Sequence, residues 1–99
     1  MSVRAIWTDD VLWEVEQHLR FVTRVYGQLA ADRLVDGLGD RVRRAAEFPR
    51  WGPRYSGSSD PDTRVVYYEH RYGIIYRVEH DAIVVLKVYD TRSPKPEMS

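Results

Sequence analysis

The sequence predicts an α+β fold, in which a helical hairpin packs on a mostly antiparallel four-stranded sheet in the order β-α-α-β-β-β. Apolar residues recur at helical spacing between residues 9 and 48, which predicts two helices. From residue 63 onward the chain is rich in β-branched and aromatic residues, which predicts three strands. A short alternating segment at residues 3–7 adds a strand before the helices.

The first strand and the first helix meet at Thr8. Residues 3–7 alternate between the two sides of a strand, and Thr8 is a favourable N-cap. Asp9 and Asp10 place negative charge in the first helical turn, where the helix dipole stabilises it. We therefore predict a helix over residues 9–26, with a glycine after it and one apolar stripe formed by Leu12, Val15, Leu19, Val22 and Tyr26.

The second helix is predicted to follow at once and to end before Pro49. Two glycines, Gly37 and Gly39, lie inside it, and each costs a helix about 1 kcal/mol relative to alanine. They indicate either the close approach of another backbone or a local break in the helix. Its apolar stripe consists of Ala31, Leu34, Leu38, Val42 and Ala45, and runs on to Phe48.

One long loop separates the helices from the strands. Residues 49–62 carry prolines and glycines among small polar residues, which is typical of a loop. Trp51 and Tyr55 are expected to anchor this loop to the body of the protein, with a partner site as the alternative. Three strands joined by tight hairpins follow, in the segments TRVVYYE, YGIIYRVE and AIVVLKVYD.

The composition limits the classes of function. A chain of 99 residues is the size of one domain, and the absence of cysteine excludes disulfides and thiolate metal sites. No apolar run reaches the ~20 residues of a membrane span, and the N-terminus lacks the order of a signal peptide. We expect a cytoplasmic protein without membrane contact, with residues 1–94 as a single domain and residues 95–99 as a short tail without a core residue.

The charges balance, because fifteen basic residues stand against fifteen acidic ones. This balance argues against a general nucleic-acid binder, which normally carries a basic excess. Five arginines lie close together in the sequence with a single acidic residue, Glu47, among them. They form either a local basic patch or the solvated end of a helix. These arginines are Arg41, Arg43, Arg44, Arg50 and Arg54.

The sequence holds few of the motifs that carry chemistry. The three histidines lack metal-ligand spacing, no glycine-rich phosphate loop occurs, and no serine lies in a nucleophile elbow. No metal and no cofactor are therefore expected. What remains is arginine, lysine and tyrosine chemistry on the sheet, which can in principle stabilise a phosphate and move protons during RNA cleavage.

Strict alternation of side chains divides each of the three later strands between two faces of the sheet. The face predicted to lie against the helices holds Val65, Tyr67, Tyr72, Ile74, Tyr76, Val78, Val84, Leu86 and Val88. The opposite face holds Arg64 and Gly73 together with the predicted partner-binding residues Val66, Tyr68, Ile75, Arg77, Ile83, Val85, Lys87 and Tyr89. An exposed face of this kind is normally polar, so its apolar residues predict burial by a partner, with tolerated exposure as the alternative.

Several segments in order resemble the RelE/ParE superfamily of type II toxin-antitoxin toxins. They are W-T-D, F-P-R-W-G, T-R-V-V-Y-Y-E, Y-G-I-I-Y-R-V and V-Y-D-T-R-S-P, and the resemblance spans residues 3–96. The ending D-T-R-x-P at residues 90–94 is similar to the ParE or plasmid-stabilisation branch. This resemblance implies a toxin that inhibits growth by binding an essential target, DNA gyrase in that branch, and that a cognate antitoxin neutralises.

The RelE branch contains ribosome-dependent mRNA endonucleases, and it gives the alternative function. Arg64 and Arg92 match two basic positions of that branch and are the candidate catalytic residues. Val66 and Gly73 replace two further basic residues, and no tyrosine follows Arg92, so the resemblance to the nuclease is partial. An antitoxin-binding module that has lost toxicity is a third possibility.

The free energy gained by burying the apolar residues of the sheet face predicted to lie away from the helices predicts where an antitoxin binds. Its C-terminal segment is expected to cover the sheet face around Val66, Ile75, Ile83 and Val85, and to pack on the helical hairpin. Aspartate at Ile75 or Val85 is then expected to weaken the complex and to leave a folded monomer.

Overall fold

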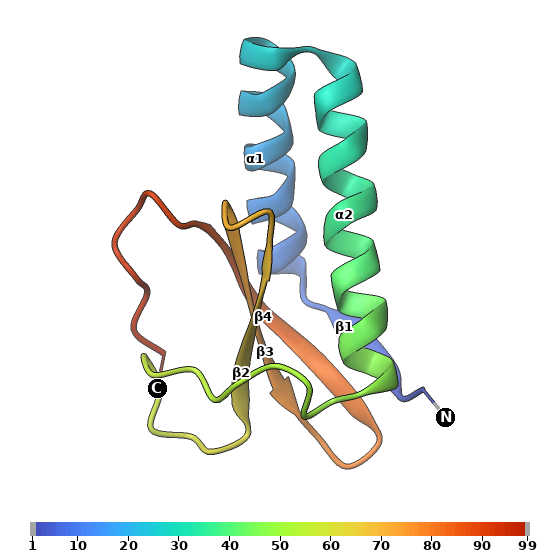
Figure 1. Cartoon of the computed structure of the whole chain (residues 1–99), viewed down its shortest axis with the longest axis vertical. Coiled ribbons are helices and arrows are strands. Elements are labelled where there is room, and N and C mark those ends of the chain that lie inside the picture. Colours follow the sequence, from blue (N-terminus) through green and yellow to red (C-terminus); the bar gives the residue numbers. More distant parts are fainter. Residues whose placement is uncertain (1, 99) are drawn as a thin grey trace.

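The computed structural model describes residues 2–98 and contains the predicted elements in the predicted order (Figure 1). The sheet order is β1-β4-β3-β2, with β1 parallel to β4 and the other pairs antiparallel. The α+β prediction is therefore confirmed. The elements are β1 (Arg4–Trp7), α1 (Asp9–Tyr26), α2 (Gln28–Glu47), β2 (Thr63–Tyr68), β3 (Tyr72–Val78) and β4 (Ala82–Asp90).

Both ends of α1 lie where the sequence predicts them. The Thr8 hydroxyl accepts a hydrogen bond from the Val11 amide at 3.2 Å, which caps the helix. Gly27 has a φ of 96°, and it turns the chain directly from α1 into α2. The two helices then lie side by side as a hairpin (Figure 1). Among residues 2–98, no helix is long and apolar enough to cross a membrane.

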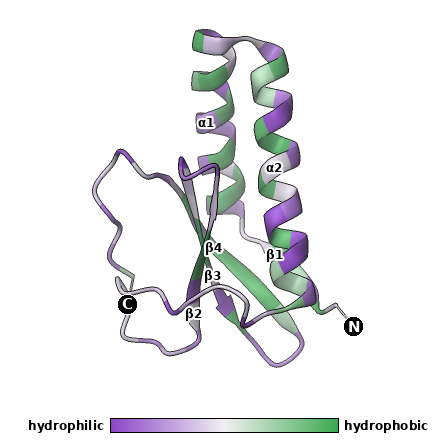
Figure 2. Ribbon diagram, in the orientation of Figure 1, coloured by the Kyte–Doolittle hydropathy of each residue, from purple (hydrophilic) through white to green (hydrophobic). Residues whose placement is uncertain are grey.

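The main core lies between the hairpin and one face of the sheet. Figure 2 shows apolar and polar residues alternating along both helices, as expected of amphipathic helices that bury one side. The helices contribute Val11, Val22, Ala31, Leu34, Leu38, Val42, Ala45 and Ala46. The sheet contributes Val66, Tyr72, Ile74, Tyr76, Ile83, Val85 and Val88.

Helix α2 passes through both of its glycines without a break. The Tyr68 ring of β2 lies so close to Gly37 that a Cβ atom there would overlap the ring. The expected approach of another backbone is therefore wrong at Gly37, because the close neighbour is a side chain. Gly39 has no comparable neighbour, because the nearest atom to a Cβ there would be an Arg43 nitrogen at 3.5 Å.

A second, smaller core lies on the other face of the sheet. It contains Tyr55, Val65, Ile75 and Tyr89, with Leu86 and Met98 packed against it. The loop of residues 49–62 and the C-terminal segment cover this face, and Figure 1 shows the two lying side by side. The loop anchor is confirmed at Tyr55, which is 1% exposed, whereas Trp51 remains 42% exposed.

The C-terminal segment is held to this loop by hydrogen bonds. The Tyr55 hydroxyl donates to the Pro96 carbonyl, and the Met98 amide donates to the Gly57 carbonyl at 2.8 Å. Met98 also packs against the second core. The expectation that residues 95–99 contain no core residue is therefore wrong for Met98, while Ser99 lies outside the described residues.

The predicted division into two faces is correct for β3 and wrong for β2 and much of β4. On β2, Val66 pairs with Ile74 and lies in the helix-side core, whereas Val65 lies in the second core. On β4, the register shifts between Ile75 and Tyr76 of β3, which leaves Leu86 as an extra residue between the paired residues Val85 and Lys87. This β-bulge breaks the alternation, so Val85 and Val88 both lie in the helix-side core.

Candidate functional site

The predicted partner-binding residues do not share an exposed face. Five of the eight are buried, and the remaining three are half-buried. The first group is Val66, Ile75, Ile83, Val85 and Tyr89, and the second is Tyr68, Arg77 and Lys87. Their predicted placement on one open face is therefore wrong. The helical hairpin covers Val66, Ile83 and Val85, while the loop and the C-terminal segment cover Ile75 and Tyr89.

Arg64 lies on the helix side of the sheet, where it binds the long loop. It pairs with Tyr76 in the register of β2 and β3, and so faces the same side as that core residue. Its Nη1 donates to the Gly52 carbonyl at 2.7 Å and to the Arg50 carbonyl at 3.4 Å, while its buried Nε has no hydrogen-bond partner among the described residues. Arg64 thus holds the start of the loop against the sheet.

Arg92 lies directly after β4, where it pairs with Asp90. Its Nη2 donates to one carboxylate oxygen at 2.8 Å and its Nε to the other at 3.2 Å. Arg71 approaches the same carboxylate at 3.4 Å. The hydrogen bonds from Arg92 are the main reason that the pKa of Asp90 is lowered to about 2, against the opposing effect of burial.

The structure does not bring these two arginines together. Arg64 is opposite Tyr76, whereas Asp90 is opposite Tyr72, which lies four residues away along β3. At the rise of a strand this separation is ~13 Å. Each guanidinium is bound by its own neighbours, so the pair does not form one catalytic centre. Among residues 2–98, no group of three or more metal-ligating side chains is placed to hold a metal ion.

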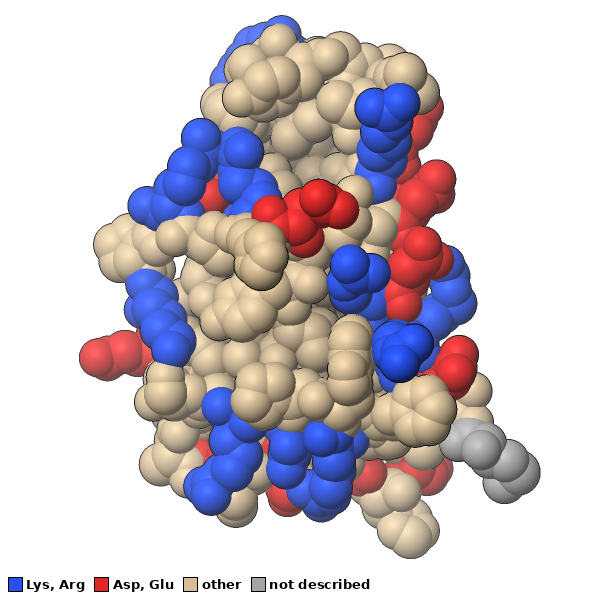
Figure 3. Space-filling view, viewed as in Figure 1, with Lys and Arg blue, Asp and Glu red and all other residues tan. Residues whose placement is uncertain are grey.

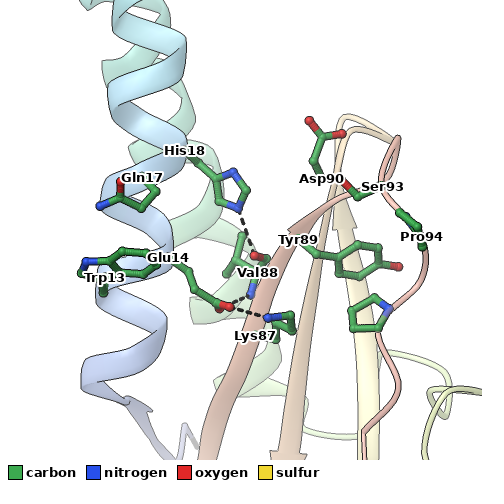
Figure 4. A pocket seen from close by; sticks show the side chains of 11 residues that line it. Trp13, Glu14, Gln17, His18, Lys87, Val88, Tyr89, Asp90, Ser93 and Pro94 are labelled. Carbon is green, nitrogen blue, oxygen red and sulfur yellow. Dashed lines mark hydrogen bonds and ion pairs between the residues drawn. The ribbon is translucent and has the colours of Figure 1, made fainter.

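Side chains of α1 cover an unpaired edge of the sheet (Figure 4). Strand β1 pairs only with residues 82–85, so the rest of β4 has β3 on one side and no strand on the other. The His18 Nε2 is 3.0 Å from the Val88 carbonyl and donates to it, and a Glu14 oxygen accepts from the Val88 amide at 3.4 Å. Glu14 also pairs with the Lys87 ammonium. An edge strand with its backbone groups bound in this way resists pairing with another chain.

An open groove of about 320 Å³ runs beside this covered edge, between α1 and the segment after β4 (Figure 4). The wall that α1 contributes is not part of the predicted apolar stripe, so the sequence did not predict it. Trp13 and Gln17 are four residues apart, as are Glu14 and His18, and this spacing places all four on one side of the helix. The wall residues are Trp13, Glu14, Gln17 and His18.

The helical hairpin also exposes large apolar side chains. The most exposed are Leu29 at 65% and Trp13 at 63%. The full set on the hairpin is Leu12, Trp13, Phe21, Val25, Tyr26, Leu29 and Val35. Between the two helices lies a hollow of about 400 Å³, lined by Trp7, Leu12, Val15, Val35, Leu38 and Gly39. An apolar hollow with exposed apolar side chains at its rim is typical of a protein-binding site.

Comparison with known proteins identifies relatives. A family model described as the ParE toxin of the type II toxin-antitoxin system parDE matches residues 5–93. The chain is similar to a solved structure of the chromosomal ParDE TA system from P. aeruginosa, with a TM-score of 0.75 and 17% identity over 90% of this chain and 96% of that chain. It is also similar to a free mutant of E. coli toxin RelE, with a TM-score of 0.63 and 16% identity over 91% of this chain and 84% of that chain. No curated protein matches it.

The family match and the fold agree. The matched residues run from within β1 to just beyond β4, and so include both helices and the whole sheet. The two solved structures have the same fold at low sequence identity. This chain therefore belongs to the ParE toxin family of type II toxin-antitoxin systems.

Proposed function

We propose that this toxin inhibits growth by binding an essential target, with DNA gyrase as the expected target, and that a cognate antitoxin neutralises it. The observation that carries the binding role is the exposed apolar surface of the hairpin, defined above by seven side chains. Burial of such surface is worth ~25 cal/mol per Å² before the entropy of association is deducted. A partner that covers several hundred Å² therefore gains several kilocalories per mole.

Two features support binding over RNA cleavage. The candidate catalytic residues Arg64 and Arg92 are separated along the sheet and bound by local partners. The sheet face away from the helices is covered by the loop and the C-terminal segment, with Tyr55 only 1% exposed beneath them. An mRNA endonuclease needs several catalytic groups within reach of one phosphate.

The antitoxin surface is accordingly proposed on the hairpin and not on the sheet. The hollow between the helices is almost wholly apolar and lies beside exposed Leu12 and Val35. A partner can reach these residues without any unfolding of the toxin. The proposal thus keeps the expected packing of the antitoxin on the helical hairpin and gives up its binding to the sheet face.

Expression of the chain in bacteria tests the function. Alone, the chain should arrest growth, and growth should resume when the small open reading frame beside its gene is expressed with it. A DNA damage response with stalled gyrase identifies the proposed target, whereas rapid loss of mRNA identifies the nuclease alternative. Harmless expression of folded protein contradicts the toxin proposal, and if that protein still binds the neighbour, the third possibility is correct.

A matched pair of variants tests the binding surface. Leu12→Asp should weaken antitoxin binding at least tenfold, because it places a charge in the apolar hollow. The fold should survive, since Leu12 is 50% exposed. The control is Thr23→Asp, an exposed position on the same helix outside that hollow, which should bind as the wild type does. Equal binding by both variants, measured by calorimetry, places the antitoxin elsewhere.

A further inference from the structure

Helix α2 carries its charges on two neighbouring strips. Positions spaced by three, four or eight residues lie on one side of a helix. The basic strip is Arg33, Gly37, Arg41, Arg44 and Phe48, and the acidic strip beside it is Asp32, Asp36, Asp40 and Glu47. Figure 3 shows basic and acidic side chains next to each other along the side of the molecule that α2 forms.

The arginine cluster noted in the sequence separates into two kinds of residue. Arg43 pairs with Asp40, and Arg50 pairs with Asp62 at 3.3 Å. Arg41, Arg44 and Arg54 have no carboxylate partner among the described residues. Of these three, Arg41 and Arg44 lie on the basic strip of α2, where their positive charges are available to a ligand.

Arg41 and Arg44 are held by stacking on aromatic rings. The Arg41 guanidinium carbon is 5.5 Å from the centre of the Tyr68 ring. The Arg44 guanidinium carbon is 5.8 Å from the Phe48 ring and 5.2 Å from the Trp51 ring. These are cation–π distances, and such a contact leaves the terminal N–H groups of each guanidinium able to bind an oxyanion. The two side chains are thus ordered in advance for phosphate or carboxylate.

The rings beside Arg44 also offer flat apolar surface. Phe48 is 55% exposed and Trp51 is 42% exposed. Both line an open hollow of about 650 Å³ at the end of α2. Nucleic-acid bases stack on such rings with little dependence on sequence. A row of phosphate-binding groups next to base-stacking rings is the arrangement that single-stranded nucleic acid requires.

We propose that the basic strip, together with Trp51, binds single-stranded nucleic acid. Arg33, Arg41 and Arg44 bind phosphates, while Phe48 and Trp51 stack on bases. This activity goes beyond the toxin role and does not depend on it. The affinity is modest and limited by salt, because the chain has no net charge and the acidic strip lies alongside. Three phosphate contacts predict that log K falls with log[salt] at a slope of about −2.

The test measures binding of the full chain to a fluorescein-labelled oligonucleotide of fifteen thymidines, by anisotropy between 50 and 200 mM NaCl. The wild type should lose about 20-fold in affinity over this range. In the double variant Arg41→Ala, Arg44→Ala the slope should fall to about −0.7, and affinity at 50 mM salt should drop at least tenfold. The control on the same helix is the double variant Asp40→Ala, Arg43→Ala, whose affinity should stay within twofold of the wild type because it removes one ion pair and no net charge.

A second variant separates stacking from charge. Phe48→Ala should lower affinity several-fold and leave the salt slope unchanged, because the ring carries no charge. Thermal unfolding of each variant controls for folding, since Arg41 Nε also donates to the Tyr67 carbonyl at 3.2 Å. Three results overturn the proposal. The first is no binding at 50 mM salt, or binding that does not weaken between 50 and 200 mM. The second is an equal loss of affinity in the double variant Asp40→Ala, Arg43→Ala, and the third is tighter arginine-dependent binding of a polyglutamate peptide, which assigns the strip to an acidic protein segment.

Discussion

Among single residues, Asp90 is the electrostatic centre of the segment after β4. Arg92 and Arg71 both bind its carboxylate, and its pKa is lowered to about 2. Because the unfolded chain binds this proton more tightly, the resulting stability is fully present above about pH 4 and is lost as the pH falls toward 2. Asp90→Asn should lower the free energy of unfolding by about 1–2 kcal/mol at pH 7, after allowance for the exposed Arg92.

Urea unfolding at pH 7 and at pH 2 checks this prediction. The difference in free energy of unfolding between wild type and Asp90→Asn should shrink to a small fraction at pH 2, where about half of the folded wild-type molecules carry a protonated Asp90. An equal difference at both pH values means that the charge is not the cause. The sequence placed Arg92 two residues after Asp90, so their pairing was foreseeable. The ion pair between Arg71 and Asp90 was not foreseeable, because it forms only when β3 and β4 pair in the observed register.

For the helices, a matched pair of glycines on α2 gives a direct test of packing. Gly39→Ala should raise the free energy of unfolding by about 0.5–1 kcal/mol, because alanine favours a helix and nothing crowds its Cβ there. Gly37→Ala should lower it by about 1 kcal/mol or more, since the Tyr68 ring must move away. Chemical denaturation of both variants decides the matter, and stabilisation by Gly37→Ala contradicts the tight contact.

The strand variants Ile75→Asp and Val85→Asp now carry a different expectation. Both side chains are 0% exposed, one in each core, so a buried charge should destabilise the protein by more than 3 kcal/mol. Circular dichroism should show an unfolded or largely unfolded chain, whereas Tyr67→Asp, at a 40% exposed position on β2, should remain folded. A folded Ile75→Asp or Val85→Asp monomer restores the original assignment of the faces.

Local signals explain why the elements were predictable and the faces were not. The Thr8 cap and the Gly27 turn act through backbone groups a few residues away, so the sequence alone locates the ends of α1. The sequence does not show which alternate residues of β2 face the helices, because Val65 and Val66 are equally apolar. The bulge at Leu86 arises only when β3 and β4 pair, and a rule of strict alternation misses it.

In the molecule as a whole, the C-terminal segment completes the second core. A chain that ends at Pro94 loses the Pro96 and Met98 hydrogen bonds and uncovers Tyr55. We expect its free energy of unfolding to fall by about 1–3 kcal/mol, from lost burial and unpaired polar groups. Thermal unfolding measures this loss, and an unchanged midpoint means that the segment does not stabilise the fold.

The pairing of β1 with β4 links the beginning of the chain to its end. Arg4 lies opposite Ala82, and Trp7 lies opposite Val85. A contact so distant along the chain forms slowly, because the entropy of closing the intervening loop must be overcome first. During synthesis, moreover, β1 has no strand beside it until β4 has been made. The nascent toxin therefore cannot complete its sheet before β4 has emerged from the ribosome, so any activity that needs the complete sheet begins only after that point.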